Sequence, residues 1–208
     1  MRNVPMNRAL FGILLIAFLM PAVGCAPVTP EKPGTIEITK VGAYSYMRQT
    51  RDIAIVVDVE MTQKRTEETY FPLGIKIANK RLSQVLVDRE TLVLVDDKDQ
   101  VYVMPSIVEL EQKYDKLVPD HKFQSQTGIM GDDLLTGFSY YQKADGRFFP
   151  QVQGGARTID SVTIRAHGYM EDMVYFPMPA GGIKGKMLKL RLDVFELDKP
   201  FEIIFPIQ

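Results

Sequence analysis

The sequence predicts a mainly-β domain, and three observations carry that prediction. Several segments alternate apolar and polar side chains with a period of two, which is the pattern of half-buried β-strands. Short polar turns separate neighbouring segments of this kind, as in hairpins. A single segment has helical spacing instead. The chain holds 208 residues, 46% of them apolar, which is enough for one domain with a sizeable core.

The two clearest strands lie near residues 52–60 and 187–194. Apolar side chains occupy every second position in both, and acidic or basic side chains fill most positions between them. We expect the apolar set to face one core, and its members are Ile53, Ile55, Val57, Val59, Leu188, Leu190, Leu192 and Val194. Residues 90–105 are predicted to form a hairpin around the acidic turn at 96–99. Weaker patterns predict strands at 36–47, 71–79, 158–167 and 173–176.

One segment, residues 106–118, is predicted to be a short helix. Ser106 is followed three residues later by Glu109, which is the capping-box spacing, and apolar residues recur at helical spacing until Pro119. Eight or nine strands with this one helical crossover predict an immunoglobulin-like or related β-sandwich. A small barrel is the alternative.

Four Phe-Pro pairs recur along the chain. Because proline cannot donate to a sheet ladder, each pair is expected at a strand end, a bulge or an edge. The pairs lie at 71–72, 149–150, 176–177 and 205–206.

The first twenty residues combine a basic start with an apolar run. Arg2 and Arg8 precede the run at 9–20, and no acidic residue occurs there. The run is shorter than the roughly 20 residues that a membrane-spanning helix needs. Residues 1–24 are therefore predicted to be a secretory signal peptide.

Small residues then lead into Cys25, the only cysteine of the chain. The segment Val23-Gly24-Cys25 resembles the lipobox of bacterial lipoproteins, with Ala22 where that family usually has Leu. The resemblance implies cleavage between Gly24 and Cys25, a diacylglycerol on the sulfur and an acylated amino terminus, with palmitate among the acyl groups. Ala26 after the cysteine implies an outer-membrane location facing the periplasm. An ordinary signal peptide, or a buried free cysteine, is the alternative.

Residues 25–34 hold three prolines and are expected to form an extended tether before a single folded domain at 35–208. Loss of residues 1–24 would leave 23 basic residues (25 less Arg2 and Arg8) against 26 acidic ones, a net charge of −3. This charge gives no electrostatic footprint for nucleic acid. A domain whose only cysteine is lipidated has no disulfide, so its stability must come from packing.

No metal, cofactor or catalytic centre is predicted. His121 and His167 are the only histidines, whereas a catalytic zinc wants three well-placed ligands. The acidic turn at 96–99 lacks the spacing of a calcium loop. Neither a nucleophile elbow nor a phosphate-binding glycine loop is found.

The remaining candidate is the glycine- and aromatic-rich stretch at 120–157, which we expect to be a long irregular loop. Aromatic side chains on loops are favoured in protein interfaces, and the candidates for partner contact are Phe138, Tyr140, Tyr141 and Phe148. The alternative is that these rings cover an open edge or end of the sandwich and fill its core.

The sequence therefore predicts a lipid-anchored binding or assembly module of an envelope complex, held to the membrane through Cys25 and contacting a protein partner. An envelope enzyme with an active site around residues 125–160 is one alternative. A structural accessory subunit that offers a free strand edge is another.

Overall fold

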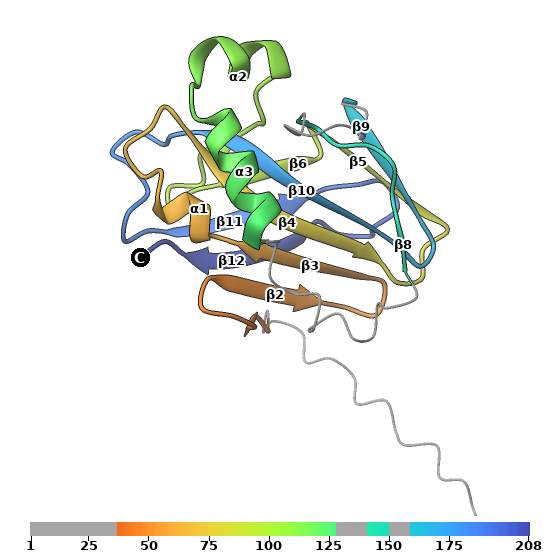
Figure 1. Cartoon of the computed structure of the whole chain (residues 1–208). Helices are drawn as coiled ribbons and strands as arrows, with labels where there is room; N and C mark the ends of the chain where they lie inside the picture. Colours follow the sequence, from red (N-terminus) through yellow and green to blue (C-terminus); the bar gives the residue numbers. More distant parts are fainter. Residues whose placement is uncertain (1–36, 128–140, 150–158) are drawn as a thin grey trace, which may run out of the picture. The chain divides into compact units, whose positions relative to one another are not determined.

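The computed structural model describes residues 37–127, 141–149 and 159–208, and residues 36–208 form one compact unit (Figure 1). The predicted signal peptide and tether lie outside the described residues, together with Phe138 and Tyr140.

The described residues are mainly β, as predicted, with twelve strands and three helices. No helix among them is long and apolar enough to cross a bilayer. The strands are β1 (Thr39–Lys40), β2 (Ser45–Gln49), β3 (Ile53–Asp58), β4 (Tyr70–Asn79), β5 (Gln84–Asp88), β6 (Leu92–Val95), β7 (Val101–Tyr102), β8 (Gln142–Lys143), β9 (Ser161–Arg165), β10 (Gly168–Pro177), β11 (Met187–Leu192) and β12 (Phe201–Pro206). The helices are α1 (Glu60–Gln63), α2 (Ile107–Lys113) and α3 (Leu117–Thr127).

The strands form three sheets. Their orders are β1-β2-β3-β4-β10-β8, β12-β11-β6-β7 and β5-β9. Pairing in these sheets is antiparallel, except that β8 runs parallel to β10. Strands β1 to β4 are neighbours in chain order, as in a meander, whereas an immunoglobulin fold distributes its strands between the sheets as ABED and CFG. The β-sandwich class is thus supported, and the immunoglobulin-like topology is not confirmed.

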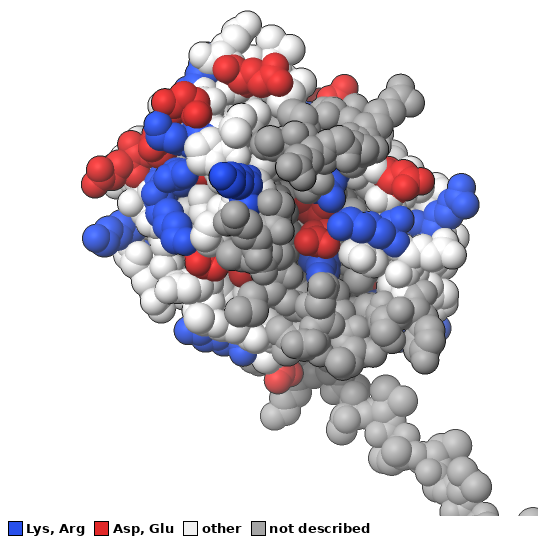
Figure 2. All heavy atoms as spheres, viewed as in Figure 1, with Lys and Arg blue, Asp and Glu red and all other residues white. Residues whose placement is uncertain are grey.

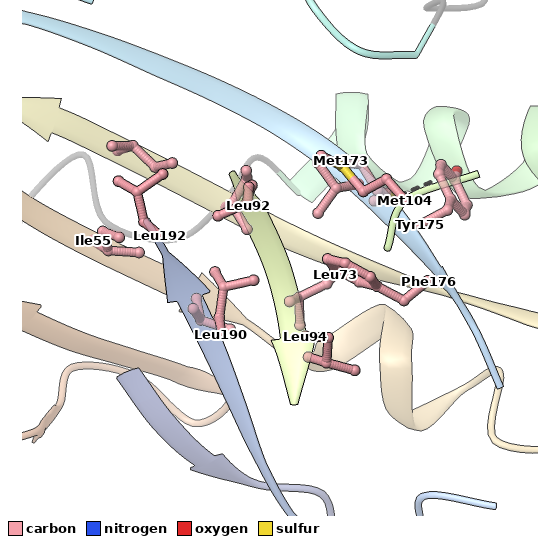
Figure 3. Packing of buried hydrophobic residues seen from close by; sticks show 14 of the residues in the cluster. Ile55, Leu73, Leu92, Leu94, Met104, Met173, Tyr175, Phe176, Leu190 and Leu192 are labelled. Carbon is pink, nitrogen blue, oxygen red and sulfur yellow. Dashed lines mark hydrogen bonds between the residues drawn. The ribbon is translucent and has the colours of Figure 1, made fainter. Parts of the chain in front are cut away.

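The core lies between the six-stranded and the four-stranded sheet. In Figure 3, Leu190 and Leu192 of β11 and Leu94 of β6 lie in the same buried cluster as Ile55 of β3 and Leu73 of β4. Along β11 the buried and more exposed positions alternate, as the sequence predicts. Strand β3 differs, because its intervening Ala54 and Val56 are buried as well. The six-stranded sheet is therefore covered on both faces at this point.

Strands β4 and β10 pair over ten residues at the centre of the six-stranded sheet. The two Tyr-Phe-Pro segments lie opposite each other, with the ring centroids of Phe71 and Phe176 6.2 Å apart. Pro72 lies beyond the residues of β4 that pair with β3, and its carbonyl accepts from Thr62 of α1. Its missing N–H therefore costs no bond to β3. Pro177 ends β10, as the Phe-Pro pattern predicts.

The helical region agrees with the prediction at its start and differs at its end. Ser106 caps α2, and its hydroxyl oxygen accepts from the Glu109 N–H at 3.1 Å. The helix ends at Lys113, and α3 begins at Leu117. Pro119 lies in the first turn of α3, where an N–H has no helical partner to lose. The predicted stop at Pro119 and the predicted irregular loop over 120–127 are therefore wrong.

Val57 and Leu190 lie in opposite sheets, and both side chains are fully buried. Replacing either by Ala should lower the free energy of unfolding by about 1 to 4 kcal/mol, through lost burial and a residual cavity. Urea denaturation measures this change. Met187→Ala is the control, because Met187 lies on β11 but is half exposed. Losses no larger than the control's at both sites would contradict this assignment of the core.

Candidate functional site

Residues 141–149 cover the outer edge of β10. The Gln142 N–H donates to the carbonyl of His167 at 3.0 Å, and the Ala144 N–H donates to that of Tyr169 at 2.7 Å. Four residues after Ala144, the Phe148 N–H donates to the Asp172 carboxylate at 2.8 Å. This part of the predicted loop is thus an ordered strip along the sheet edge.

Phe148 and Phe149 hold this strip in place. Both side chains are fully buried, and the Phe149 ring packs edge-on against Tyr175, with centroids 5.1 Å apart. Phe148 therefore has the edge-covering and core-filling role that the sequence left as the alternative. It does not face a partner, because none of its surface is free.

Arg89, in the turn between β5 and β6, joins the strip to two other segments. Its guanidinium donates to the carbonyls of Phe148 and Pro105. It also donates to the Asp160 carboxylate at 3.2 Å and lies 4.6 Å from the centroid of the Phe149 ring, a favourable cation–π geometry. These bonds start from Nε, Nη1 and Nη2 of one planar group, a fixed arrangement of donors that the point charge of a lysine does not reproduce.

Asp172 is the buried carboxylate at the base of the strip. One carboxylate oxygen accepts from the Phe148 N–H and the other from the Met173 N–H, each at 2.8 Å. Burial raises the pKa of Asp172 to about 7, although these N–H groups and the positive charges of Arg147 and Arg89 oppose the rise. The folded protein therefore holds the Asp172 proton to a higher pH than an exposed aspartic acid would.

A second group of buried polar side chains lies beneath α3, which crosses the outer face of β4 and β10 (Figure 1). Asp120 accepts from Arg65 Nη2 at 2.7 Å and from Nε at 2.9 Å, while the Tyr114 hydroxyl donates to its other oxygen. Burial raises the Asp120 pKa, and the bonds from Tyr114 and Arg65 lower it in part. These bonds tie α3 to α2 and to the segment before β4.

His121 follows directly and is almost fully buried. Within the part of the chain that the structure describes, neither ring nitrogen has a hydrogen-bond partner. The ring lies against Tyr175, with centroids 6.2 Å apart, and the Tyr175 hydroxyl is 3.5 Å from the Met173 sulfur (Figure 3). Burial lowers the His121 pKa to about 4, and Arg147 adds to this effect. His121 is therefore neutral at pH 7.

The hydrogen bonds of Asp172 and Asp120 join separate segments of the fold. Asp120 and Asp172 are fully buried, and their oxygens accept from groups of the same chain. No set of three or more His, Cys, Asp or Glu side chains within the described ranges could hold a metal ion. Among the described residues, these two buried carboxylates therefore bind groups of the protein itself.

Among the candidates from the sequence, Tyr141 is half buried and lies edge-on to His167, with centroids 5.6 Å apart. Cys25, Gly24, Phe138 and Tyr140 lie outside the described residues. The sequence reasoning missed Arg65, Arg89, Asp120 and Asp172. Only Asp172 gave a usable signal, because it takes the apolar place in the alternating run Met170, Asp172, Val174 and Phe176.

No family model, curated protein or solved structure matches this chain. Its function is therefore inferred from its own residues.

Asp172 should make stability fall as pH rises. Its folded pKa of about 7 lies above the unfolded value of about 3.9, so the unfolded state releases the proton first. The free energy of unfolding of the wild type, minus that of Asp172→Asn, should decrease from pH 4 to pH 7 and then level off. Urea denaturation across this range measures the difference, and His121 titrates in both proteins and cancels. A flat difference would refute the assignment. The control is Asp97→Asn, the same change from carboxylate to amide at an exposed turn position, where burial does not act on the carboxyl group.

The bond between Asp120 and Arg65 should matter far more than a surface ion pair. Asp120→Ala leaves the Arg65 guanidinium and the Tyr114 hydroxyl without their acceptor, and should cost about 3 kcal/mol of unfolding free energy. Lys113→Ala breaks the exposed pair with Glu109 and should cost no more than about 0.5 kcal/mol. If Asp120→Ala and Lys113→Ala lost equal amounts of unfolding free energy in thermal or urea denaturation, the stabilising role of the Asp120 bonds would be contradicted.

Proposed function

We propose that this chain is a lipid-anchored protein of the bacterial cell envelope, and that its β-sandwich is a binding or assembly module. The observation that carries the proposal is Val23-Gly24-Cys25, placed directly after a basic start and a short apolar run. Lipidation gives the single cysteine a role. Ala26 supports an outer-membrane location facing the periplasm.

The physical chemistry of the anchor supports this proposal. Stable attachment to a bilayer takes more than one acyl chain, and each buried CH₂ contributes about 0.8 kcal/mol. A diacylglycerol together with an acylated amino terminus meets that requirement. The compact unit begins at residue 36, so about ten residues separate it from Cys25. At roughly 3 Å per residue, a proline-rich segment of this length spans about 30 Å.

Side chains, more than strand edges, are the proposed means of binding. Edge strands β1, β7 and β8 are two residues long, which blunts them as templates for a partner strand. At the other edge of the four-stranded sheet, β12 has its Glu202 carbonyl occupied by Arg48 at 2.7 Å, and Pro206 offers no N–H there. Strands β5 and β9 form a separate sheet of two strands, five residues each. On the face seen in Figure 2, acidic and basic side chains of the described residues lie interspersed, in keeping with a near-neutral chain.

Cys25→Ser should abolish membrane anchoring. The wild-type protein should partition into the detergent phase and carry acyl groups in its intact mass, since the thiol is the attachment point. The variant should remain in the aqueous phase without acyl mass, with its signal peptide less efficiently removed. Thr29→Ser is the control in the tether, and it should partition as the wild type does. A wild-type protein found in the aqueous phase without acyl mass would refute the anchor.

A further inference from the structure

Phe195 is the most exposed apolar side chain of the described domain. Its exposure is 102%, while the other exposed large apolar side chains range from 37% to 59%. It lies in the connection between β11 and β12. Burying such a ring is worth roughly 1.5 to 3 kcal/mol, and the described fold makes no use of that energy.

The connection holds Phe195 outward through its neighbours. Val194 is buried in the core, and Leu197 packs partly against it. The Asp193 N–H donates to the Thr91 carbonyl at 2.8 Å, and the Leu197 N–H donates to the Val194 carbonyl at 3.1 Å. A ring presented on a fixed backbone loses little conformational freedom when it binds, which favours affinity.

The residues that flank Phe195 in this connection include three acidic side chains and one basic side chain. Asp193 and Asp198 are exposed and Glu196 is half exposed, and Lys199 is the only basic residue from 193 to 200. Among the described residues, none of these three carboxylates takes part in an ion pair. An aromatic anchor with acidic side chains around it complements an apolar pocket with a basic rim.

We propose that Phe195 inserts into an apolar pocket of a partner protein whose rim carries Lys or Arg side chains. This inference rests on the proposed binding function and names the surface and the partner chemistry that serve it. The bilayer that would hold Cys25 is a less suitable acceptor, because carboxylates resist transfer into its apolar interior and an anionic lipid surface repels them.

Site-specific photo-crosslinking in cells tests the proposal on the full-length protein. A photoreactive phenylalanine analogue replaces Lys199, which lies in the same connection as Phe195. We expect a crosslinked partner whose yield falls about tenfold with Phe195→Ser, equivalent to about 1.4 kcal/mol of binding. Neutralising Asp193, Glu196 and Asp198 to amides should also lower the yield, and the crosslinked segment of the partner should carry Lys or Arg.

Two controls separate recognition from folding. Phe195→Ser should leave the melting temperature nearly unchanged, because an exposed substitution alters stability by no more than about 0.5 kcal/mol. Val101→Ser, at another exposed apolar side chain, should leave the crosslinking yield unchanged.

Four outcomes overturn the inference. One is a yield that does not respond to Phe195→Ser, and another is a crosslinked species that is a second copy of this chain. The third is membrane insertion, detected with Phe195→Trp, because the chain has no other tryptophan. In that case brominated lipid would quench its emission in the full chain reconstituted in vesicles of phosphatidylethanolamine and phosphatidylglycerol. The fourth is capture of a partner by the same photoreactive analogue placed at Val103, another exposed apolar position, with a yield that does not depend on Phe195. That result would exclude Phe195 as the binding residue and leave the proposed binding function in place.

Discussion

The ten-residue pairing of β4 with β10 is the interaction on which the rest of this domain depends. The four-stranded sheet covers one face of this pair, and α3 lies against the other face, where His121 contacts Tyr175. Every residue of β4 is buried as a result. Burying a polar group near this pair is costly unless the group has a hydrogen-bond partner inside the protein. Asp172 and Asp120 have such partners, and their bonds fix the edge strip and α3.

The sequence predicted the strands and helix ends that depend on residues close together in the chain. Period-two alternation identified β3 and β11, and Ser106 identified the start of α2, where a side-chain oxygen caps the helix. The extent of the helical region was not predictable in this way. The stretch 117–127 has no clear apolar stripe, and α3 is instead held by the contacts of Asp120 and His121 with distant residues. Tertiary contacts of this kind leave little trace in sequence spacing.

The buried hydrogen bonds of Arg65 and Arg89 could not be predicted from local sequence patterns either. Arg65 and Asp120 lie 55 positions apart, and Arg89 and Phe148 lie 59 apart, so no motif spacing joins them. Asp172 alone could have been identified, since a carboxylate at an apolar position of a strand needs a buried partner. The aromatic stretch was recognised as unusual. Its described part, however, covers the edge of β10, and the most exposed ring among the described residues is Phe195.

Native-state amide hydrogen exchange tests the central pairing most directly. If β4 and β10 are enclosed as described, their hydrogen-bonded amides should exchange only through global unfolding, with opening free energies equal to that from urea denaturation. Amides of the short edge strands β1 and β7 should open at lower cost. Amides of β4 and β10 that exchange through a cheaper local opening, as readily as those of β1 and β7, would contradict this account.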